Sequence, residues 1–510
     1  MPPTLLLAGT CAWAAAAAGP GAPATVSRPN ILFILADDMG YGDVGYLQIG
    51  SDHGRLLTPN LDKLTKQGMR FTDAYAGAPV CAPSRCTLMT GRHSGHATVR
   101  SNGPILNTSD VTVANVLSDA GYDTALIGKW GLGDINTTGD PGAKGFNYFF
   151  GQTDQANCHN YYPSFMYRNQ DNVTIPENVG ASDATCGPDR EKCKWSGDLW
   201  TEEAIKFLGK FAEGEKDPFF LYLSYTAPHA GSIGDDDEHG EPVPRISKGP
   251  YADKKDDWGK EQEYAAAVTE IDTQVGLVLA ALESFNLDQN TLVLFASDNG
   301  ASNEGGHSYM FFNSSGPLKG YKRSLHEGGH RTAFLARWPG VIEPGSLSTH
   351  QITFYDFLAT AADLGHGKVP EGNDGMSFAP TLRGELQEGR PFVYHEYCAP
   401  TELYRGWGQA VRIGNLTAVC LGPQPGSAPG AGIPACKTPL VYDLGVDLHQ
   451  DNDIADQHPD FVQQALKIMT EEHVPGEYCG KAVFGNVRVE VDPRNFEDPE
   501  DHAAFFGEEA

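Results

Sequence analysis

Acidic and amide side chains follow two strongly apolar stretches of the sequence. The stretch "NILFILADD" ends in Asp37 and Asp38, and "TLVLFASDNG" ends in Asp298 and Asn299. Carboxylate and amide oxygens are hard donors that suit Ca²⁺ or Mg²⁺ and not Zn²⁺. One such pair would also fit an ordinary turn at the end of a strand. Two of them in one chain predict a divalent-cation site made by these four residues.

Two further apolar stretches end in side chains that can bind an anion or move a proton. "TALIGKWG" reaches Lys129, and "PFFLYLSYTAPH" reaches His229. Taken alone, Lys129 would be interpreted as a surface ion-pair residue and His229 as an exposed loop residue. Four apolar stretches that all end in compatible chemistry favour one shared site instead.

A cysteine without an evident partner lies in the segment "PVCAPSRCTLMTGR". A nucleophilic thiol needs a base or a cationic pocket, and Arg85 does not accept a proton from Cys81. Cys86 is the other cysteine close by, and its spacing does not match a tight zinc site. A disulfide is the ordinary alternative. The residues near Cys81 therefore leave its role open.

The elements that must position these residues alternate between strands and helices. Uninterrupted apolar runs are typical of strands buried on both faces of a parallel sheet. Residues 198–213 and 261–285 carry apolar side chains at helical spacing. The alternation predicts an α/β fold, with a large sheet sandwiched by helices and a ligand site beyond the carboxyl ends of its strands.

The character of the sequence changes after residue 385. Short strands are expected over 390–397, 409–419 and 439–447, followed by a helix over 459–473. We therefore predict a main domain over 27–385 and a small α+β subdomain with an antiparallel sheet over 386–485. Residues 1–24 resemble a secretory signal peptide, because a short apolar stretch is followed by small residues. Residues 486–510 form an acidic tail.

Charge and targeting restrict the partners of the protein. The formal net charge of −29 argues against nucleic acid and anionic membranes as main partners. It still allows an anionic substrate in a local cationic pocket. No stretch after the signal peptide is long and apolar enough for a membrane span, so none is predicted. A signal peptide directs the chain into the secretory pathway.

The cysteines and glycosylation sequons agree with secretion. Of ten cysteines, eight remain when Cys11 and Cys81 are set aside, and an even number favours disulfides in a secreted chain. The simplest local pairs are Cys186–Cys193 and Cys420–Cys436. Sequons for N-glycosylation, some of which we expect to be used, occur at Asn107, Asn136, Asn172, Asn313 and Asn415.

The segment around Cys81 resembles the signature of the type I, formylglycine-dependent sulfatases, which are arylsulfatase-like members of the alkaline-phosphatase-like superfamily. "CAPSRCTLMTGR" matches the family pattern of Cys, Pro, Ser, Arg, Leu, Thr and Gly. The likeness continues through "NILFILADDMGYGD", "GYDTALIGKWGLG", "TAPHAG", "FASDNG", "GPLKGYKRSLHEGGHR" and "VYDLGVDLHQDNDIADQHP". It covers nearly the whole mature chain and implies that 27–385 is a sulfatase catalytic domain.

The resemblance implies a chemistry that a thiol cannot perform. In this family a formylglycine-generating enzyme oxidises the cysteine to formylglycine, whose hydrated aldehyde attacks the sulfur of a sulfate ester and later releases sulfate. A bound cation, Ca²⁺ or possibly Mg²⁺, activates the hydroxyl, and basic groups neutralise the sulfate. Carried over by motif, the metal ligands are Asp37, Asp38, Cys81, Asp298 and Asn299.

The same carry-over assigns catalytic roles to Cys81, Arg85, Lys129, His229 and Lys322. Arg85 steadies the hydrate, and His229 protonates the leaving oxygen. Lys129 and Lys322 contact the sulfate, with Lys319 as the alternative to Lys322. The family motif places Cys81 near the start of a helix, with Pro83 in its first turn. Cys86 would lie inside this helix as a core or disulfide residue, with a structural and not a catalytic role. The histidines of "RHSGH", His93 and His96, are expected to serve loop structure rather than metal binding.

One position departs from the family pattern. "KWGLG" places Gly131 where many members have a histidine that assists formylglycine. His159 in "NCHNYYP" lies on a plausible substrate loop, and we take it as the candidate substitute and substrate contact. The loops over 151–168 and 303–318 are expected to select the substrate.

The expected function is release of inorganic sulfate from a sulfated sugar or glycan, with aryl sulfates as surrogates, either outside the cell or in the lysosome. Two alternatives stay open. The first is a phosphate or phosphonate monoester hydrolase of the same superfamily. The second is a sulfatase-like protein that binds sulfated glycans without catalysis, which Gly131 invites.

Overall fold

A computed structural model describes the chain from Arg28 onward, with gaps. The described residues are 28–47, 56–155, 157–180, 186, 192–214, 217–231, 240–398, 407–421 and 436–474. The signal peptide expected over 1–24 and the acidic tail expected over 486–510 lie outside the described residues.

The largest element is a ten-stranded sheet with the strand order β11-β2-β10-β9-β1-β8-β4-β5-β6-β7. Its five central strands are parallel: β9 (Thr291–Ser297), β1 (Asn30–Asp37), β8 (Phe219–Pro228), β4 (Asp123–Lys129) and β5 (Tyr148–Gln152). Both flanks contain antiparallel pairs. One flank holds β10 (Phe334–Arg337), β2 (Met69–Phe71) and β11 (Ser346–Ser348), and the other holds β6 (Phe165–Arg168) and β7 (Asp171–Thr174).

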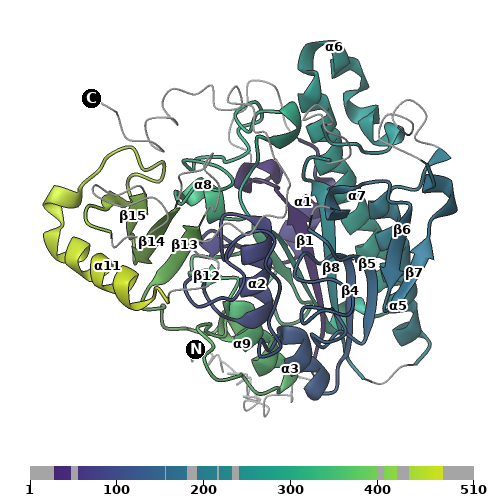
Figure 1. Ribbon diagram of the computed structural model, residues 1–510, viewed down its shortest axis with the longest axis horizontal. Coiled ribbons are helices and arrows are strands. Elements are labelled where there is room, and N and C mark those ends of the chain that lie inside the picture. The colour runs from purple at the N-terminus through teal and green to yellow at the C-terminus, as the bar shows by residue number, and fades with distance from the viewer. Residues whose placement is uncertain are drawn as a thin grey trace, which may run out of the picture.

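Helices cover both faces of this sheet (Figure 1). The alternating side chains of β1 show why: Phe33 belongs to one hydrophobic core and Ile34 to the other, and neither is exposed. One core includes α2 (Cys81–Thr90), α3 (Val113–Asp119), α9 (Asp356–Gly365) and α10 (Ala379–Leu382). The other includes α1 (Pro59–Gln67), α5 (Ser196–Ala212) and α7 (Lys260–Ser284). The predicted α/β sandwich with a mixed, mainly parallel sheet is confirmed.

Smaller elements complete the described part of the main domain. A two-stranded sheet pairs β3 (Ala74–Tyr75) with β12 (Ile352–Thr353), and two short helices, α6 and α8, span Lys255–Trp258 and Glu327–His330. The prediction that no stretch after the signal peptide is long and apolar enough for a membrane span is wrong for α7, which alone among the described helices meets both criteria. However, 72% of its 18-residue apolar window is buried inside the protein. Such burial is what the core helix of a folded domain shows.

A four-stranded antiparallel sheet lies in the C-terminal region, as predicted. It contains β13 (Val393–Cys398), β14 (Trp407–Ile413), β15 (Leu416–Leu421) and β16 (Leu440–Asp443). Helix α11 (Pro459–Glu471) packs Phe461 and Ala465 into the hydrophobic core of this sheet. Residues 409–419, expected as one strand, instead belong to a hairpin, because Gly414 takes a positive φ of 60° in the two-residue turn between Ile413 and Leu416.

Ion pairs connect this C-terminal sheet and helix to the main domain. Arg412 lies 2.6 Å from Asp73, and Arg100 lies 3.1 Å from Glu396. The predicted loop histidines take part: His93 Nε2 lies 3.0 Å from Glu472, just after α11, and His96 Nδ1 lies 3.0 Å from the Asp374 carboxylate. These contacts are consistent with the loop role expected for His93 and His96, although the two rings and Asp374 also form a group that could hold a metal ion.

The cysteines follow the predicted pairing only in part. The two local pairs, Cys186–Cys193 and Cys420–Cys436, form disulfides. Cys86 and Cys158 are buried free thiols, so Cys86 is a core residue and not a disulfide residue, the other role considered for it. Cys86 lies on α2 and packs in the hydrophobic core, and the Cys158 thiol donates a hydrogen bond to the Gln152 carbonyl at 3.2 Å. Cys479 lies outside the described residues.

Candidate active site

Four neighbouring strands of the large sheet end at the same edge, and each delivers predicted site residues there. The register pairs Ala36 of β1 with Ser297 of β9, and Asp37 with Pro228 of β8. The strands β9, β1, β8 and β4 therefore present, in this order, Asp298 with Asn299, Asp37 with Asp38, His229, and Lys129. This adjacency explains how residues from four distant stretches of sequence reach one place.

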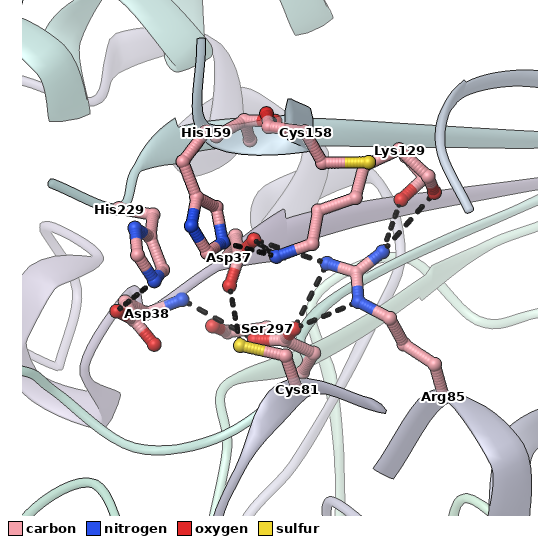
Figure 2. A network of polar contacts seen from close by, with 12 residues as sticks. Asp37, Asp38, Cys81, Arg85, Lys129, Cys158, His159, His229 and Ser297 are labelled. Carbon is pink, nitrogen blue, oxygen red and sulfur yellow. Dashed lines mark hydrogen bonds and ion pairs between the residues drawn. The ribbon is translucent and has the colours of Figure 1, made fainter. Parts of the chain in front are cut away.

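The predicted metal ligands converge at this edge. Asp38 takes the left-handed conformation, with φ of 65°, and its backbone N–H donates to Asp298 Oδ1 at 3.2 Å. The Asn299 amide donates to Asp38 Oδ1 at 2.7 Å. The Cys81 thiol donates to Asp37 Oδ1 at 3.2 Å (Figure 2). Ligand atoms of Asp37, Asp38, Cys81 and His229 all lie within 4.8 Å of one another.

This donor set fits a hard divalent cation. Asn299 Oδ1 is buried and has no hydrogen-bond partner among the described residues, so it is free to bind an ion. Burial, followed by the charge of Asp37, raises the pKa of Asp298 to about 7. Such a rise is the electrostatic cost of crowding buried carboxylates together, and a cation between them would remove it. Oxygen donors outnumber the single sulfur and the imidazole, which favours Ca²⁺ or Mg²⁺.

Helix α2 presents Cys81 and Arg85 to the edge of the sheet where the predicted metal ligands converge. The helix begins at Cys81, with Pro83 in its first turn as predicted. The two side chains are four residues apart and therefore lie on one helix face. Arg85 lies 2.8 Å from Asp298 Oδ2 and 3.4 Å from Asp37 Oδ2. Its guanidinium also donates to the Ser224 hydroxyl.

The Cys81 side chain is completely buried. Burial, and next the negative charge of Asp37, raises the pKa of its thiol well above the ordinary value. The thiol is therefore protonated at neutral pH, and a protonated thiol is a poor nucleophile. Its hydrogen-bond acceptor is the Asp37 carboxylate. Although burial opposes the charge, Lys129 holds the pKa of Asp37 well below its ordinary value, so this carboxylate is a poor base for the thiol proton.

Two buried lysines each pair with one carboxylate of the site. Lys129 Nζ lies 2.5 Å from Asp37 Oδ2, and Lys322 Nζ lies 2.7 Å from Asp38 Oδ2. Lys319, the alternative to Lys322, instead points toward Asp451 at 3.9 Å and is partly exposed. The structure therefore brings Lys322, and not Lys319, into the site.

The loop that carries Lys322 depends on close backbone packing. A Cβ on Gly300 would lie 1.8 Å from the Gly328 carbonyl oxygen, so only glycine fits beside Asn299. The Lys322 backbone N–H donates to the Ala301 carbonyl at 2.7 Å. Together these contacts place the lysine directly over the end of β9.

Two stacked histidines lie over the carboxylates (Figure 2). The rings of His159 and His229 stack with their centroids 3.8 Å apart. His229 Nδ1 donates to the Ala230 carbonyl at 2.7 Å, which leaves Nε2 facing Lys322 Nζ at 3.1 Å. His159 Nε2 accepts from Lys129 Nζ at 2.9 Å. Burial, then the charges of His229 and Lys129, lowers the pKa of His159 well below its ordinary value, so this ring is neutral.

Some residues of the site were not predicted from the sequence. Glu304 lies 2.7 Å from Lys322 Nζ and 3.3 Å from His229 Nε2, at the partly exposed rim. Its one sequence signal is that it follows "SDNG" on a loop expected to bind substrate. Ser224 and Tyr222 contact Arg85 from inside β8. Ser224 is a polar residue that interrupts an apolar strand. This is a weak signal, because the sequence alone does not show what the side chain contacts.

Comparisons with known proteins point to one family. The family model described as Sulfatase matches residues 29–367. N-acetylgalactosamine-6-sulfatase of Mus musculus is 33% identical over 403 residues, which cover 74% of this chain and 69% of the relative. Arylsulfatase A of Bos taurus is 31% identical over 502 residues, which cover 91% of this chain and 90% of the relative. The crystal structure of Ps i-CgsB superposes with a TM-score of 0.71 at 25% identity, covering 89% of this chain and 96% of that one.

Proposed function

Because this chain belongs to the sulfatase family and is a sulfatase, we propose that it releases inorganic sulfate from a sulfated sugar or glycan through a formylglycine made from Cys81. A divalent cation would be held by Asp37, Asp38, Asp298, Asn299 and residue 81. The single observation that carries the proposal is the state of Cys81. It is buried and protonated, and it donates to a carboxylate that is a poor base, yet it lies among the carboxylates and the buried lysines that a cation and an oxyanion would need.

The two absent groups supply chemistry that the residues around them support. Formylglycine supplies a hydroxyl nucleophile at position 81, and the cation, when bound, lowers the pKa of that hydroxyl. Arg85 reaches Asp37 and Asp298 from the helix that carries residue 81, and so keeps the two carboxylates and residue 81 in one geometry. The maturation partner that this proposal requires is a formylglycine-generating enzyme.

Sulfate binding is proposed for Lys129 and Lys322. Their ammonium groups each pair with one carboxylate of the site, and each can turn a donor toward a sulfate oxygen placed between them. Buried cations that face developing negative charge lower the barrier more than exposed ones do. The lysines would also neutralise the anionic ester inside an acidic protein whose net charge is −29.

Protonation of the leaving oxygen is proposed for His229. Its Nδ1 is committed to the Ala230 carbonyl, so the proton that reaches the departing alcohol is carried at Nε2. His159 stacks on this ring and accepts from Lys129, which supports its role as a substrate-site residue. If His159 also substitutes for the histidine absent at Gly131, His159→Ala should lower turnover, and full turnover in that variant would reject the substitution.

The proposed substrate class and location rest on separate observations. The relative from Mus musculus is named for a sulfated amino sugar, and the sequence carries a predicted signal peptide. We therefore propose a sulfated carbohydrate as substrate, met along the secretory route, in the lysosome or outside the cell.

The test is to compare turnover of an aryl sulfate, the matching aryl phosphate and a panel of sulfated monosaccharides. The proposal expects sulfate release from the aryl ester and from at least one sugar. Faster turnover of the phosphate would instead favour a phosphate or phosphonate monoester hydrolase. Tight glycan binding without sulfate release, with Cys81 fully converted, would favour a binding protein.

A further inference from the structure

The space next to Lys129 is occupied in an unexpected way. Gly131 follows Lys129 by two residues in the sequence and has a positive φ of 73°. A Cβ at residue 131 would lie 2.4 Å from Gln155 Oε1 and 4.0 Å from Lys129 Cε. The amide of Gln155 therefore fills the volume in which a side chain at 131 would begin, beside the side chain of Lys129.

Backbone hydrogen bonds fix the loop of Gln155 over this position. The Trp130 N–H donates to the Gln152 carbonyl at 3.0 Å, and the Gly131 N–H donates to the Thr153 carbonyl at 3.1 Å. The same loop continues into the short helix Asn157–His159, which brings His159 to Lys129. Gln155 therefore lies shortly after backbone contacts to Trp130 and Gly131 and shortly before His159, which contacts Lys129.

The amide of Gln155 has nothing to bind in the described part of the chain. Its Oε1 and Nε2 are both buried, and neither has a hydrogen-bond partner. Buried polar atoms are nearly always paired, and an unpaired one is costly unless a ligand completes it. An amide offers two donor hydrogens, and a sulfate group offers only acceptors.

We propose that Gln155 is a sulfate-binding residue that occupies the place of the side chain missing at Gly131. Its Nε2 donates a hydrogen bond to an oxygen of the sulfate group held by Lys129. This inference rests on the proposed function and adds a residue to its substrate site. Because a carboxamide neither gives nor takes a proton at neutral pH, Gln155 binds and orients the sulfate and leaves proton transfer to other groups.

The test uses the full-length, cation-loaded enzyme with Cys81 converted, and it measures two quantities. The first is kcat/KM for an aryl sulfate, and the second is the dissociation constant of inorganic sulfate by calorimetry. Gln155→Met keeps the volume and removes the donor, and Gln155→Glu keeps the shape and adds a negative charge. Loss of a hydrogen bond to a charged group predicts, for Gln155→Met, a kcat/KM about 10- to 100-fold lower and a sulfate dissociation constant about 10- to 100-fold higher, with larger changes for Gln155→Glu.

A second pair of variants separates binding from packing. Gly131→Ala should displace the Gln155 amide and weaken sulfate binding by a similar factor. In a Gln155→Ala background, the same Gly131→Ala change should weaken sulfate binding less than in the wild-type enzyme, because the displaced group is already gone and only the strain at the positive φ of residue 131 remains.

Two results would overturn the inference. One is a Gln155→Met variant with unchanged sulfate affinity and unchanged kcat/KM. The other is full additivity of the Gly131→Ala and Gln155→Ala effects on sulfate affinity. If the wild-type enzyme with Cys81 converted hydrolyses no sulfate ester at all, the proposed function fails instead. That result is recognisable before any variant is made.

Discussion

Replacing Lys322 with alanine tests whether the buried lysine pair binds the substrate. Lys322 Nζ lies 2.7 Å from Asp38 Oδ2 and 2.7 Å from Glu304 Oε2. The variant removes a charged donor that we propose contacts the sulfate, and the loss of one such donor typically lowers kcat by about 100- to 1,000-fold, or roughly 3–4 kcal/mol. We expect a decrease in kcat/KM of this size for an aryl sulfate.

The same change should also affect stability, and in a cation-dependent way. Removing Lys322 leaves the Asp38 carboxylate fully buried without its partner, which typically costs about 3–5 kcal/mol of unfolding free energy. Glu304 contributes less, because it is partly exposed. A cation bound at Asp38 would offset the loss. Adding Ca²⁺ should therefore raise the free energy of unfolding more in the variant than in the wild-type protein.

Lys319→Ala is the matched control for Lys322→Ala. Its ammonium group is partly exposed and 3.9 Å from Asp451, so unfolding free energy should change by no more than about 0.5 kcal/mol, with kcat/KM preserved. The assays are sulfate release and urea unfolding with and without Ca²⁺. The reasoning would be refuted by a folded Lys322→Ala variant that keeps more than about a tenth of kcat/KM, or by equal losses in the two variants.

Three further predictions follow from the cation site, the buried charges and the surface. Dialysis against a chelator should abolish sulfate release and lower the melting temperature, and Ca²⁺ should restore both, because the ion binds only the folded carboxylate cluster; unchanged melting after chelation would contradict this site. His307 Nδ1 lies 2.8 Å from Glu241, and although burial opposes the charge, Glu241 raises the pKa of His307 to about 9. Because this folded-state pKa exceeds the unfolded value, the stabilisation is complete below pH about 6.5 and is lost as pH rises to about 9; His307→Gln should remove this part of the pH dependence in urea unfolding, and an unchanged pH slope would argue against it. In protein secreted by a eukaryotic host, glycopeptide mass spectrometry should find glycans among Asn107, Asn136, Asn172 and Asn415, which are exposed, and none on Asn313, which is half-buried with φ of 55°; a glycan on Asn313 would contradict the role given to burial.

The central part of the fold was predictable because its strands carry their own signal. Fully apolar runs mark the buried parallel strands, and the polar residue that ends each run marks the edge where ligands bind. Periodicity also located α5, α7 and α11. The flanking strands of the sheet are short and depend on contacts with partners far away in sequence, so no local pattern indicated them. The hairpin at Gly414 was missed because strand length alone did not reveal its two-residue turn.

The site residues divide in the same way, into those that a sequence motif revealed and those that only contacts in the folded structure reveal. Motif spacing selected Lys322 over Lys319, and the structure brings the selected lysine to Asp38. Glu304 and Gln155 lie on the two loops expected to select the substrate, but neither was singled out, because neither belongs to a recognisable spacing. The even cysteine count could not show that Cys86 and Cys158 are free thiols, since parity does not reveal which thiols are buried in the core.

The most direct test of this account is mass spectrometry of the peptide that carries Cys81, from active protein made in a secretory pathway. The account predicts an aldehyde in place of the thiol, with sulfate release proportional to the converted fraction. An unmodified Cys81 thiol throughout a preparation that hydrolyses sulfate esters would contradict it.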